Sequence, residues 1–206
     1  MIHMIRDRPS IKLAFLSVII LVLVGGSVSL FLPSPSLQLF SHSDRAIPKG
    51  KANFSPEDDL EDIDVNLIRS AHSSIDVAMY SFTDHRIEAA LADAAKSGVE
   101  IIIYRDALQY ADEESRAIKS GTSSVTDELR GTKRIEVRIK GGGQSMHLKA
   151  FCLDGSILRT GSANWSPDGE KRQDNDLYVV KDPSIVKAFE DDFKSLWDRS
   201  DNRLLD

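Results

Sequence analysis

From Phe54 onward, the apolar positions of the chain alternate between the spacing of helices and that of strands. A first helical spacing is found at Leu60, Ile63, Leu67, Ile68 and Ala71. Ser55 and Pro56 supply a capping hydroxyl and a first-turn proline, so we expect this helix to begin there. Residues 74–82 then alternate Ile75, Val77 and Met79 with polar or small positions, which predicts a strand.

The alternation continues toward the C-terminus. We predict a helix capped by Thr83 and ended by Gly98, strands over 99–104 and 134–140, a helix over 111–119 that ends at Gly121, and a last helix over 184–198. Residues 99–104 are almost all apolar, which is typical of an inner strand covered on both faces. The order of elements predicts an α/β sandwich with a central mixed sheet.

The N-terminal part of the chain has a different pattern. An uncharged run of 20 residues, 13–32, follows three basic residues within residues 1–12. This length suits a membrane anchor, and the small residues in "GGSVS" leave signal-peptide cleavage as the alternative. Both predict an exported domain, with the basic flank in the cytoplasm. We therefore divide the chain into a signal anchor or signal peptide (1–33), a linker (34–53) and one folded domain (54–206).

One apolar stretch, residues 145–166, is interrupted by polar residues at fixed spacing. The pattern H-x-K-x4-D-x6-G-S-x-N is formed by His147, Lys149, Asp154, Gly161, Ser162 and Asn164. In a strand, His147 and Lys149 would project from one face, with Leu148 turned into the core. Six matched positions are far more specific than an isolated glycine motif.

This pattern resembles the HKD signature of the phospholipase D superfamily, and residues 54–198 resemble its short bacterial members with one motif per chain. The resemblance implies an α/β/α sandwich and a phosphodiesterase that needs no metal and no other cofactor. His147 would attack phosphorus and form a phosphohistidine. Lys149, Asn164 and Ser162 would then hold the phosphate oxygens.

The acidic members of the site have competing interpretations. Asp154 belongs to the catalytic motif, but in the family this aspartate commonly stands back from the phosphate and holds the motif's loop, and we expect that structural role here. A further acid orients the nucleophile in the family. In "KRQDNDLYVV" an ungapped count from Gly161 gives Asn175, and a one-residue gap gives Asp174. We assign the role to Asp174, with Asp176 as the other candidate.

A single motif supplies only one of the two histidines that the family uses. His3, His42, His72 and His85 lie outside any comparable pattern. We therefore expect a two-fold homodimer, in which His147 of a second copy completes one shared site.

The charge distribution bears on the substrate. The net charge is −6, yet residues 130–172 hold nine Lys or Arg against four Asp or Glu, a local charge of +5. Arg134, Arg138 and Lys140 would share one strand face and lead a polyanion toward His147. Nucleic acid is the expected substrate, as for the short bacterial endonucleases that the chain resembles. Phospholipid is the alternative, supported by the membrane segment.

Three other features receive structural interpretations. Gly141–Gly143 lack the lysine and hydroxyl of a P-loop, so we expect a flexible turn rather than a phosphate-binding loop. Trp165 is expected to pack beneath the active-site loop rather than to stack on the substrate. Cys152 is the only cysteine, in an apolar run, which predicts a buried inert thiol and excludes an intramolecular disulfide.

Overall fold

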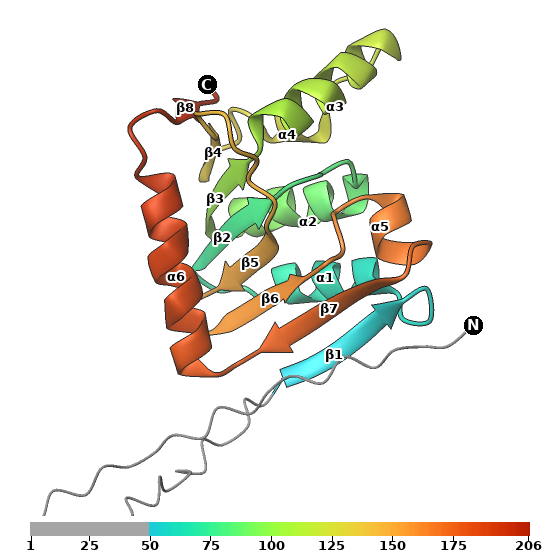
Figure 1. Ribbon diagram of the computed structural model, residues 1–206, viewed down its shortest axis with the longest axis vertical. Helices are drawn as coiled ribbons and strands as arrows, with labels where there is room; N and C mark the ends of the chain where they lie inside the picture. The colour runs from blue at the N-terminus through green and yellow to red at the C-terminus, as the bar shows by residue number, and fades with distance from the viewer. Residues whose placement is uncertain (1–49) are drawn as a thin grey trace, which may run out of the picture. The chain divides into compact units, whose positions relative to one another are not determined.

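Eight strands form one mixed sheet in the computed structural model, which describes residues 50–206 (Figure 1). The order across the sheet is β1-β7-β6-β5-β2-β3-β4-β8. The strands are β1 Gly50–Ser55, β2 Ser74–Met79, β3 Glu100–Arg105, β4 Ile135–Ile139, β5 Lys149–Leu153, β6 Ile157–Gly161, β7 Asn175–Val180 and β8 Arg203–Leu204. Neighbours β2, β3 and β4 are parallel, and all other neighbouring pairs are antiparallel.

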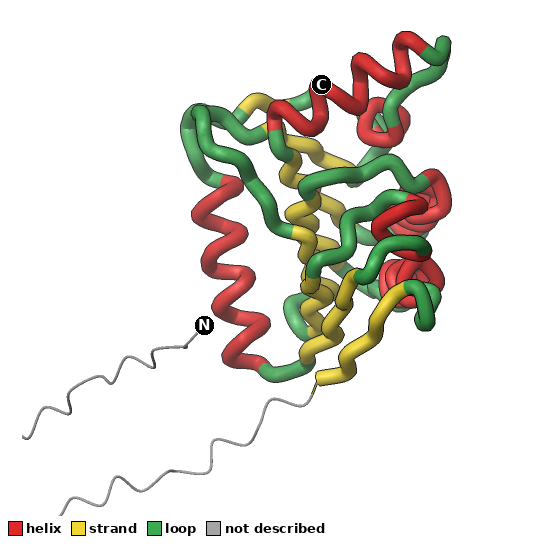
Figure 2. Tube along the Cα trace, turned by 45° about the vertical axis from the view of Figure 1, so that its right-hand side comes forward, coloured by secondary structure: helices red, strands yellow, loops and turns green. Residues whose placement is uncertain are grey.

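Helices cover both faces of the sheet, which Figure 2 shows from its edge. Helix α6 (Pro183–Trp197) covers one face. The other face carries α1 (Leu60–Arg69), α2 (His85–Lys96), α4 (Val125–Leu129) and α5 (Pro167–Lys171). Helix α3 (Ala107–Lys119) projects beyond the end of the sheet (Figure 1). This arrangement confirms the α/β/α sandwich.

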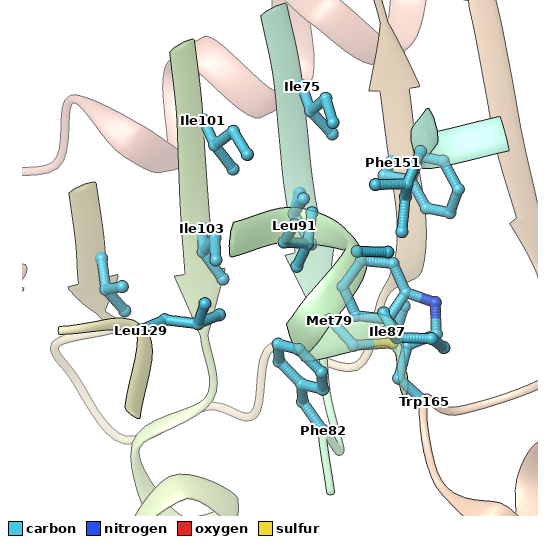
Figure 3. Packing of buried hydrophobic residues seen from close by; sticks show 14 of the residues in the cluster. Ile75, Met79, Phe82, Ile87, Leu91, Ile101, Ile103, Leu129, Phe151 and Trp165 are labelled. Atoms are coloured by element: carbon cyan, nitrogen blue, oxygen red, sulfur yellow. The ribbon is translucent and has the colours of Figure 1, made fainter. Parts of the chain in front are cut away.

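The larger part of the core lies between the sheet and helices α1 and α2. Ile75, Val77 and Met79 of β2 point into it, as their alternation predicts, whereas Ala78 packs in the separate cluster under α6. Trp165 is fully buried in the larger core beside Phe82 and Phe151 (Figure 3). The structural interpretation of Trp165 is therefore confirmed.

The prediction that the first helix begins at Ser55 and Pro56 is wrong. Residues 50–55 form β1, which pairs with β7, so residues 50–53 belong to the sheet and not to a linker. Helix α1 begins at Leu60 and is capped by Asp59, whose side chain accepts a hydrogen bond from the N–H of Asp62. The Ser55 hydroxyl instead donates to the carbonyl of Gln173 at 2.7 Å. A six-residue edge strand that pairs with a segment more than 100 residues away has little local signal.

Other helix boundaries are close to the prediction. Asp84, not Thr83, caps α2, because its carboxylate accepts from the N–H groups of Arg86 and Ile87. Gly98 and Gly121 follow α2 and α3 with φ of 106° and 73°, the left-handed region in which glycine is favoured, as expected for residues that end helices.

The predicted anchor or signal peptide, and residues 34–49 of the predicted linker, lie outside the described residues. Within residues 50–206, no helix has both the length and the apolar character that crossing a bilayer requires.

Candidate active site

The polar motif lies at one edge of the sheet. Strand β5 runs antiparallel to both β2 and β6, so the start of β5 lies beside the ends of those two strands. His147 precedes β5, Lys149 is its first residue, and Gly161 ends β6. We call this the motif edge of the sheet. The carboxyl ends of the parallel strands β2, β3 and β4 point to the same edge, the usual site of function in such sheets.

His147 and Lys149 form the centre of the site. Lys149 Nζ lies 3.1 Å from His147 Nδ1 and donates to the His147 carbonyl oxygen at 2.8 Å. The Tyr80 ring supports both side chains, with its centroid 4.5 Å from that of the imidazole and 4.7 Å from Lys149 Nζ. Sequence analysis missed Tyr80, which follows the predicted strand without a motif of its own.

Exposure differs sharply between neighbours in this segment. The imidazole of His147 is exposed, whereas Lys149 is only 7% exposed. Burial lowers the pKa of Lys149 to about 8, because desolvation disfavours the ammonium form. Leu148 is 37% exposed, so the prediction that it turns into the core is wrong. It lies at the rim of the sheet, just before β5 begins.

Asn164 and Ser162 follow β6 on the same edge. The Asn164 side-chain oxygen accepts from the N–H of Ser81 at 3.2 Å, which fixes the amide and leaves its NH₂ group to donate. The Ser162 hydroxyl accepts from the N–H of Asp176 at 2.9 Å, and the N–H of Ser162 donates to the Asp176 carboxylate at 2.7 Å. The motif edge thus gathers an imidazole, an ammonium, an amide and a hydroxyl, which are groups suited to a phosphate.

The candidates for the orienting acid differ in their contacts. Asp174 is exposed and precedes β7, while the side chain of Asn175 donates to the carbonyl of Gly169 at 3.0 Å. Asp176 is joined to the motif through Ser162, and hydrogen bonding by Ser162 lowers its pKa. No hydrogen bond links any of the three to the His147 ring in residues 50–206, so the assignment to Asp174 stays a prediction.

A family comparison agrees with this geometry. The model of the family described as "Cardiolipin synthase, PLD-like domain" matches residues 65–197, which include the entire motif and most of the sheet. The chain belongs to the phospholipase D superfamily.

Individual relatives in this superfamily carry different names. The chain is 25% identical over 134 residues to a mitochondrial cardiolipin hydrolase of Danio rerio, covering 64% of this chain and 54% of that one. It is 27% identical over 157 residues to a phospholipase D of Rickettsia bellii (strain RML369-C), covering 76% and 73%. The chain thus spans about half the length of the cardiolipin hydrolase.

Among solved structures, the phospholipase D family member Nuc from Salmonella typhimurium is similar to this chain with a TM-score of 0.60. The two are 25% identical, and the match covers 77% of this chain and 98% of Nuc. The domain is therefore similar to Nuc over nearly the whole of that protein.

Asp154 of the superfamily motif lies at the other end of β5 from His147. Its carboxylate accepts from the N–H groups of His72, Ser73 and Ser74 and from the Ser73 hydroxyl, at 2.8 to 3.2 Å. Partial burial opposes ionisation, but these hydrogen bonds prevail and lower the pKa of Asp154 to about 2. These contacts fasten the β5–β6 turn to the start of β2, in keeping with the expected structural role of Asp154, and its part in catalysis stays a prediction.

A buried ionic cluster centred on Arg159 holds the backbone of the motif. Arg159 of β6 donates to the carbonyls of Lys149 and Ala163, at 3.0 and 3.2 Å, and pairs with Asp64 and Glu170. All three charged side chains are fully buried. Burial, together with the nearby Asp64 carboxylate, raises the pKa of Glu170 to about 9. Burial raises the pKa of Asp64 as well, so both acids resist ionisation beside the Arg159 guanidinium.

A second buried pair holds the loop that follows β2. Arg105 donates to the carbonyls of Met79 and Tyr80 and pairs with Glu113 at 2.6 Å. Glu113 in turn accepts from the Ser81 hydroxyl at 2.9 Å. These contacts fix both the support for the imidazole and the anchor of Asn164. An arginine within each apolar strand pattern, "IIIYR" and "ILRTG", was the available signal for both clusters.

A groove of about 340 Å³ adjoins the motif. It is lined by His147 together with Lys140, Asp192 and Arg199. The prediction that Arg134, Arg138 and Lys140 lead a substrate into the site is wrong for the two arginines. Arg134 pairs with Glu100 at 3.0 Å, and the Arg138 guanidinium lies 4.3 Å from the Trp197 ring centroid. Both arginines interact with side chains of the domain itself. Of the three basic residues, only Lys140 lines the groove.

The glycine turn beside this groove is required by its backbone. Gly142 has φ of 74°, and a Cβ on Gly141 would collide with the backbone of Asp201. The turn interpretation of Gly141–Gly143 is confirmed.

The remaining candidates form no hydrogen bond with His147 or Lys149 within residues 50–206. His72 lies in the loop beside Asp154, and His85 begins α2, with Nδ1 3.6 Å from the Glu128 carboxylate. His3 and His42 fall outside the described residues. Cys152 is buried, as predicted. Within residues 50–206, two clusters of side chains could hold a metal ion, and neither includes a motif residue. They are His85, Glu88 and Glu128, and Asp59, Glu61 and Asp62.

Proposed function

We propose that this chain hydrolyses phosphodiesters through a phosphohistidine at His147, without a metal. The observation that carries this proposal is the pairing of an exposed imidazole with a buried ammonium that has no carboxylate within 4.0 Å in the described part of the chain. An uncompensated cation beside a nucleophile favours an anionic substrate and stabilises the charge of its transition state.

The reaction has two balanced steps. A lone pair of the His147 ring forms a bond to phosphorus, while the bond from phosphorus to the leaving oxygen breaks and that oxygen takes a proton from a general acid. In the second step, water donates a proton to the general acid, which is now deprotonated and acts as a base. The water oxygen bonds to phosphorus and the bond from phosphorus to His147 breaks. Lys149 and the NH₂ group of Asn164 hold the non-bridging oxygens in both steps.

The general acid is proposed to be His147 of a second copy. The chain carries one motif. Of its other described histidines, His72 lies beside Asp154 at the other end of β5, and His85 contacts Glu128. A two-fold axis near the motif edge would place the two imidazoles on opposite sides of one phosphate. The similarity to Nuc over 98% of that protein supports a self-contained domain of this size.

Nucleic acid is the proposed substrate, and the activity that of an endonuclease without sequence preference. Support comes from the resemblance of the motif and its flanking segments to the short bacterial endonucleases. Phospholipid is the second candidate, because the matched family and two relatives are described by cardiolipin or phospholipase D. We also propose that the domain is exported and either tethered to the membrane or released, on the basis of residues 13–32.

The deciding experiment compares purified full-length chain on single-stranded DNA, RNA and vesicles of cardiolipin or phosphatidylcholine, with and without EDTA. We expect nucleic-acid cleavage that persists in EDTA and an acid-labile phosphoryl adduct on His147. His147→Asn should reduce turnover by about a thousandfold or more. His85→Asn, which removes an exposed imidazole elsewhere, is the matched control and should retain activity. EDTA-sensitive cleavage, or activity that survives His147→Asn, contradicts the mechanism, and faster cleavage of vesicles replaces the nuclease with a phospholipase.

A further inference from the structure

Lys140 is a largely buried residue whose ammonium has no ion-pair partner within residues 50–206. It is 8% exposed, and its Nζ donates to the carbonyl oxygen of Gly141 at 2.8 Å. No carboxylate lies within 4.0 Å of this ammonium in residues 50–206. The charge of Lys140 is therefore not balanced by an ion pair within the described part of the chain.

Two carboxylates, those of Asp106 and Asp201, lie near Lys140 without forming an ion pair with it. Asp106 caps α3, where it accepts from two backbone N–H groups, and it also accepts from the N–H of Met146 at 2.8 Å. Asp201 packs against Gly142 but forms no ion pair with Lys140. The ammonium is thus left to interact with an anion from outside the chain.

The groove gives that anion a place beside the nucleophile. Lys140 lines the groove of about 340 Å³ that contains His147. Arg199, which follows α6, lines it too and forms no ion pair in the described part of the chain. Asp192 is the single acid among the lining residues. The fixed charges of the lining therefore favour a negative group.

Lys140 and Lys149 approach the groove from strands that are not neighbours. Lys149 begins β5 and Lys140 follows β4, and these strands are separated by β2 and β3. Three strand spacings place the backbones of the two lysines about 14 Å apart. This spacing gives Lys140 room to hold a second phosphate while Lys149 holds the one that is cleaved.

We propose that Lys140 and Arg199 form a second anion subsite, which holds the phosphate next to the scissile one in a polynucleotide. This inference rests on the proposed phosphodiesterase function and deepens it. The subsite contributes binding and register rather than chemistry, because its groups do not touch the reacting phosphorus. Sequence would matter little, since the contact is to the backbone.

The test uses two matched pairs of substrates with purified full-length chain. Thymidylyl-(3′→5′)-thymidine has one phosphate, and its 5′-phosphorylated form has two. Phosphatidylglycerol and cardiolipin, in mixed micelles of one detergent, form the equivalent lipid pair. Loss of one charge-assisted hydrogen bond predicts that Lys140→Gln raises KM about tenfold for the two-phosphate nucleotide, with kcat retained. The one-phosphate nucleotide should change by less than about twofold.

Two variants separate this role from a structural one. Lys140→Arg keeps the charge, so its KM for the two-phosphate nucleotide should stay close to the wild-type value. Lys181→Gln removes an exposed lysine at the far end of β7 from the motif and should leave both KM values unchanged. Arg199→Gln should raise KM for the two-phosphate nucleotide alone, as Lys140→Gln does.

The outcomes distinguish the subsite from the activity. If Lys140→Gln changes KM equally for both nucleotides, or for neither, the subsite is refuted while hydrolysis of the one-phosphate substrate still supports the proposed function. An effect confined to the lipid pair overturns the polynucleotide in favour of a lipid with two phosphates. If wild type hydrolyses none of the four, both proposals fail.

Discussion

Lys149 Nζ lies 3.1 Å from His147 Nδ1, and this contact constrains the proton of the imidazole. An ammonium can only donate, so Nδ1 accepts and a neutral ring carries its hydrogen on Nε2. A ring nitrogen with a free lone pair is needed to attack phosphorus. The ammonium must therefore leave Nδ1 when a phosphate arrives, and the phosphate oxygens are the stronger acceptors that can draw it away.

This exchange predicts that the nitrogen shifts of the His147 ring change on anion binding. Nitrogen-detected NMR of ¹⁵N-histidine-labelled chain should show the His147 ring as the Nε2–H form when free. Saturating vanadate, a mimic of the phosphoryl group, should change the shifts of both ring nitrogens as Lys149 moves. His85→Asn removes a neighbouring signal and serves to assign the spectrum. Unchanged ring shifts with bound vanadate contradict the exchange.

Lys149 also predicts the alkaline limb of the activity profile. Its pKa is lowered to about 8 by burial, and only the protonated form attracts phosphate. The value of kcat/KM on a small phosphodiester should therefore be maximal below pH 8 and fall as pH rises through it. A guanidinium stays charged in this range, so any activity that Lys149→Arg retains should lack this limb. A wild-type profile that stays flat to pH 10 excludes the ammonium as the phosphate-binding group.

Asp154 should matter for stability and not for chemistry. Asp154→Asn keeps a residue suited to its φ of 51° but loses the charge that backbone N–H groups stabilise, so we expect a loss of about 1–2 kcal/mol at pH 7. The folded pKa of about 2 lies below the ordinary 3.8, so this contribution is complete above that value and disappears as pH falls toward 2.

Urea unfolding of wild type and Asp154→Asn at pH 7 and pH 3 measures this difference, with Glu57→Gln as an exposed control. The activity of folded Asp154→Asn should match that of wild type. A large loss of turnover with unchanged stability would return Asp154 to the catalytic residues.

The sequence predicts those parts of the fold and site that depend on local patterns. Helices α2 and α6 and strand β2 follow from periodicity within single segments, and His147 and Lys149 meet because two residues of extended chain separate them. Strand β1 escaped prediction because its only partner is β7, far along the chain. Tyr80 and Arg159 reach the motif through sheet pairing between β2, β5 and β6, which no local pattern encodes.

Charge was harder to interpret than pattern. Arg134, Arg138 and Lys140 are equivalent in the alternation of one strand, yet their surroundings give them different roles. Arg134 pairs with Glu100, which is 34 residues away in the chain, and Arg138 packs on Trp197, which is 59 residues away. A local excess of basic residues therefore does not establish which of them remain available to a substrate.

The cluster around Arg159 gives a prediction that contrasts two acids. Glu170 has a pKa of about 9 and is protonated at pH 7, so Glu170→Gln replaces one neutral group by another and should cost less than about 1 kcal/mol. Asp64→Asn removes the carboxylate that pairs with Arg159 and accepts from the Trp165 indole, and should cost about 3 kcal/mol. Urea unfolding at pH 7 measures both. Equal losses would contradict the proposed difference in protonation between the two acids.

The proposed shared site predicts that an inactive copy poisons an active one. Purified full-length chain should be a dimer by light scattering, and each site should need His147 from both copies. After subunit exchange with an about ninefold excess of His147→Asn, only about one tenth of the wild-type copies remain paired with each other, so total activity should fall to about that fraction. The same excess of His85→Asn, whose motif is intact, should add activity instead. If wild-type activity is unaffected by His147→Asn although exchange is demonstrated by light scattering of tagged copies, each chain completes its own site, and His72 or His85 must be reconsidered as the general acid.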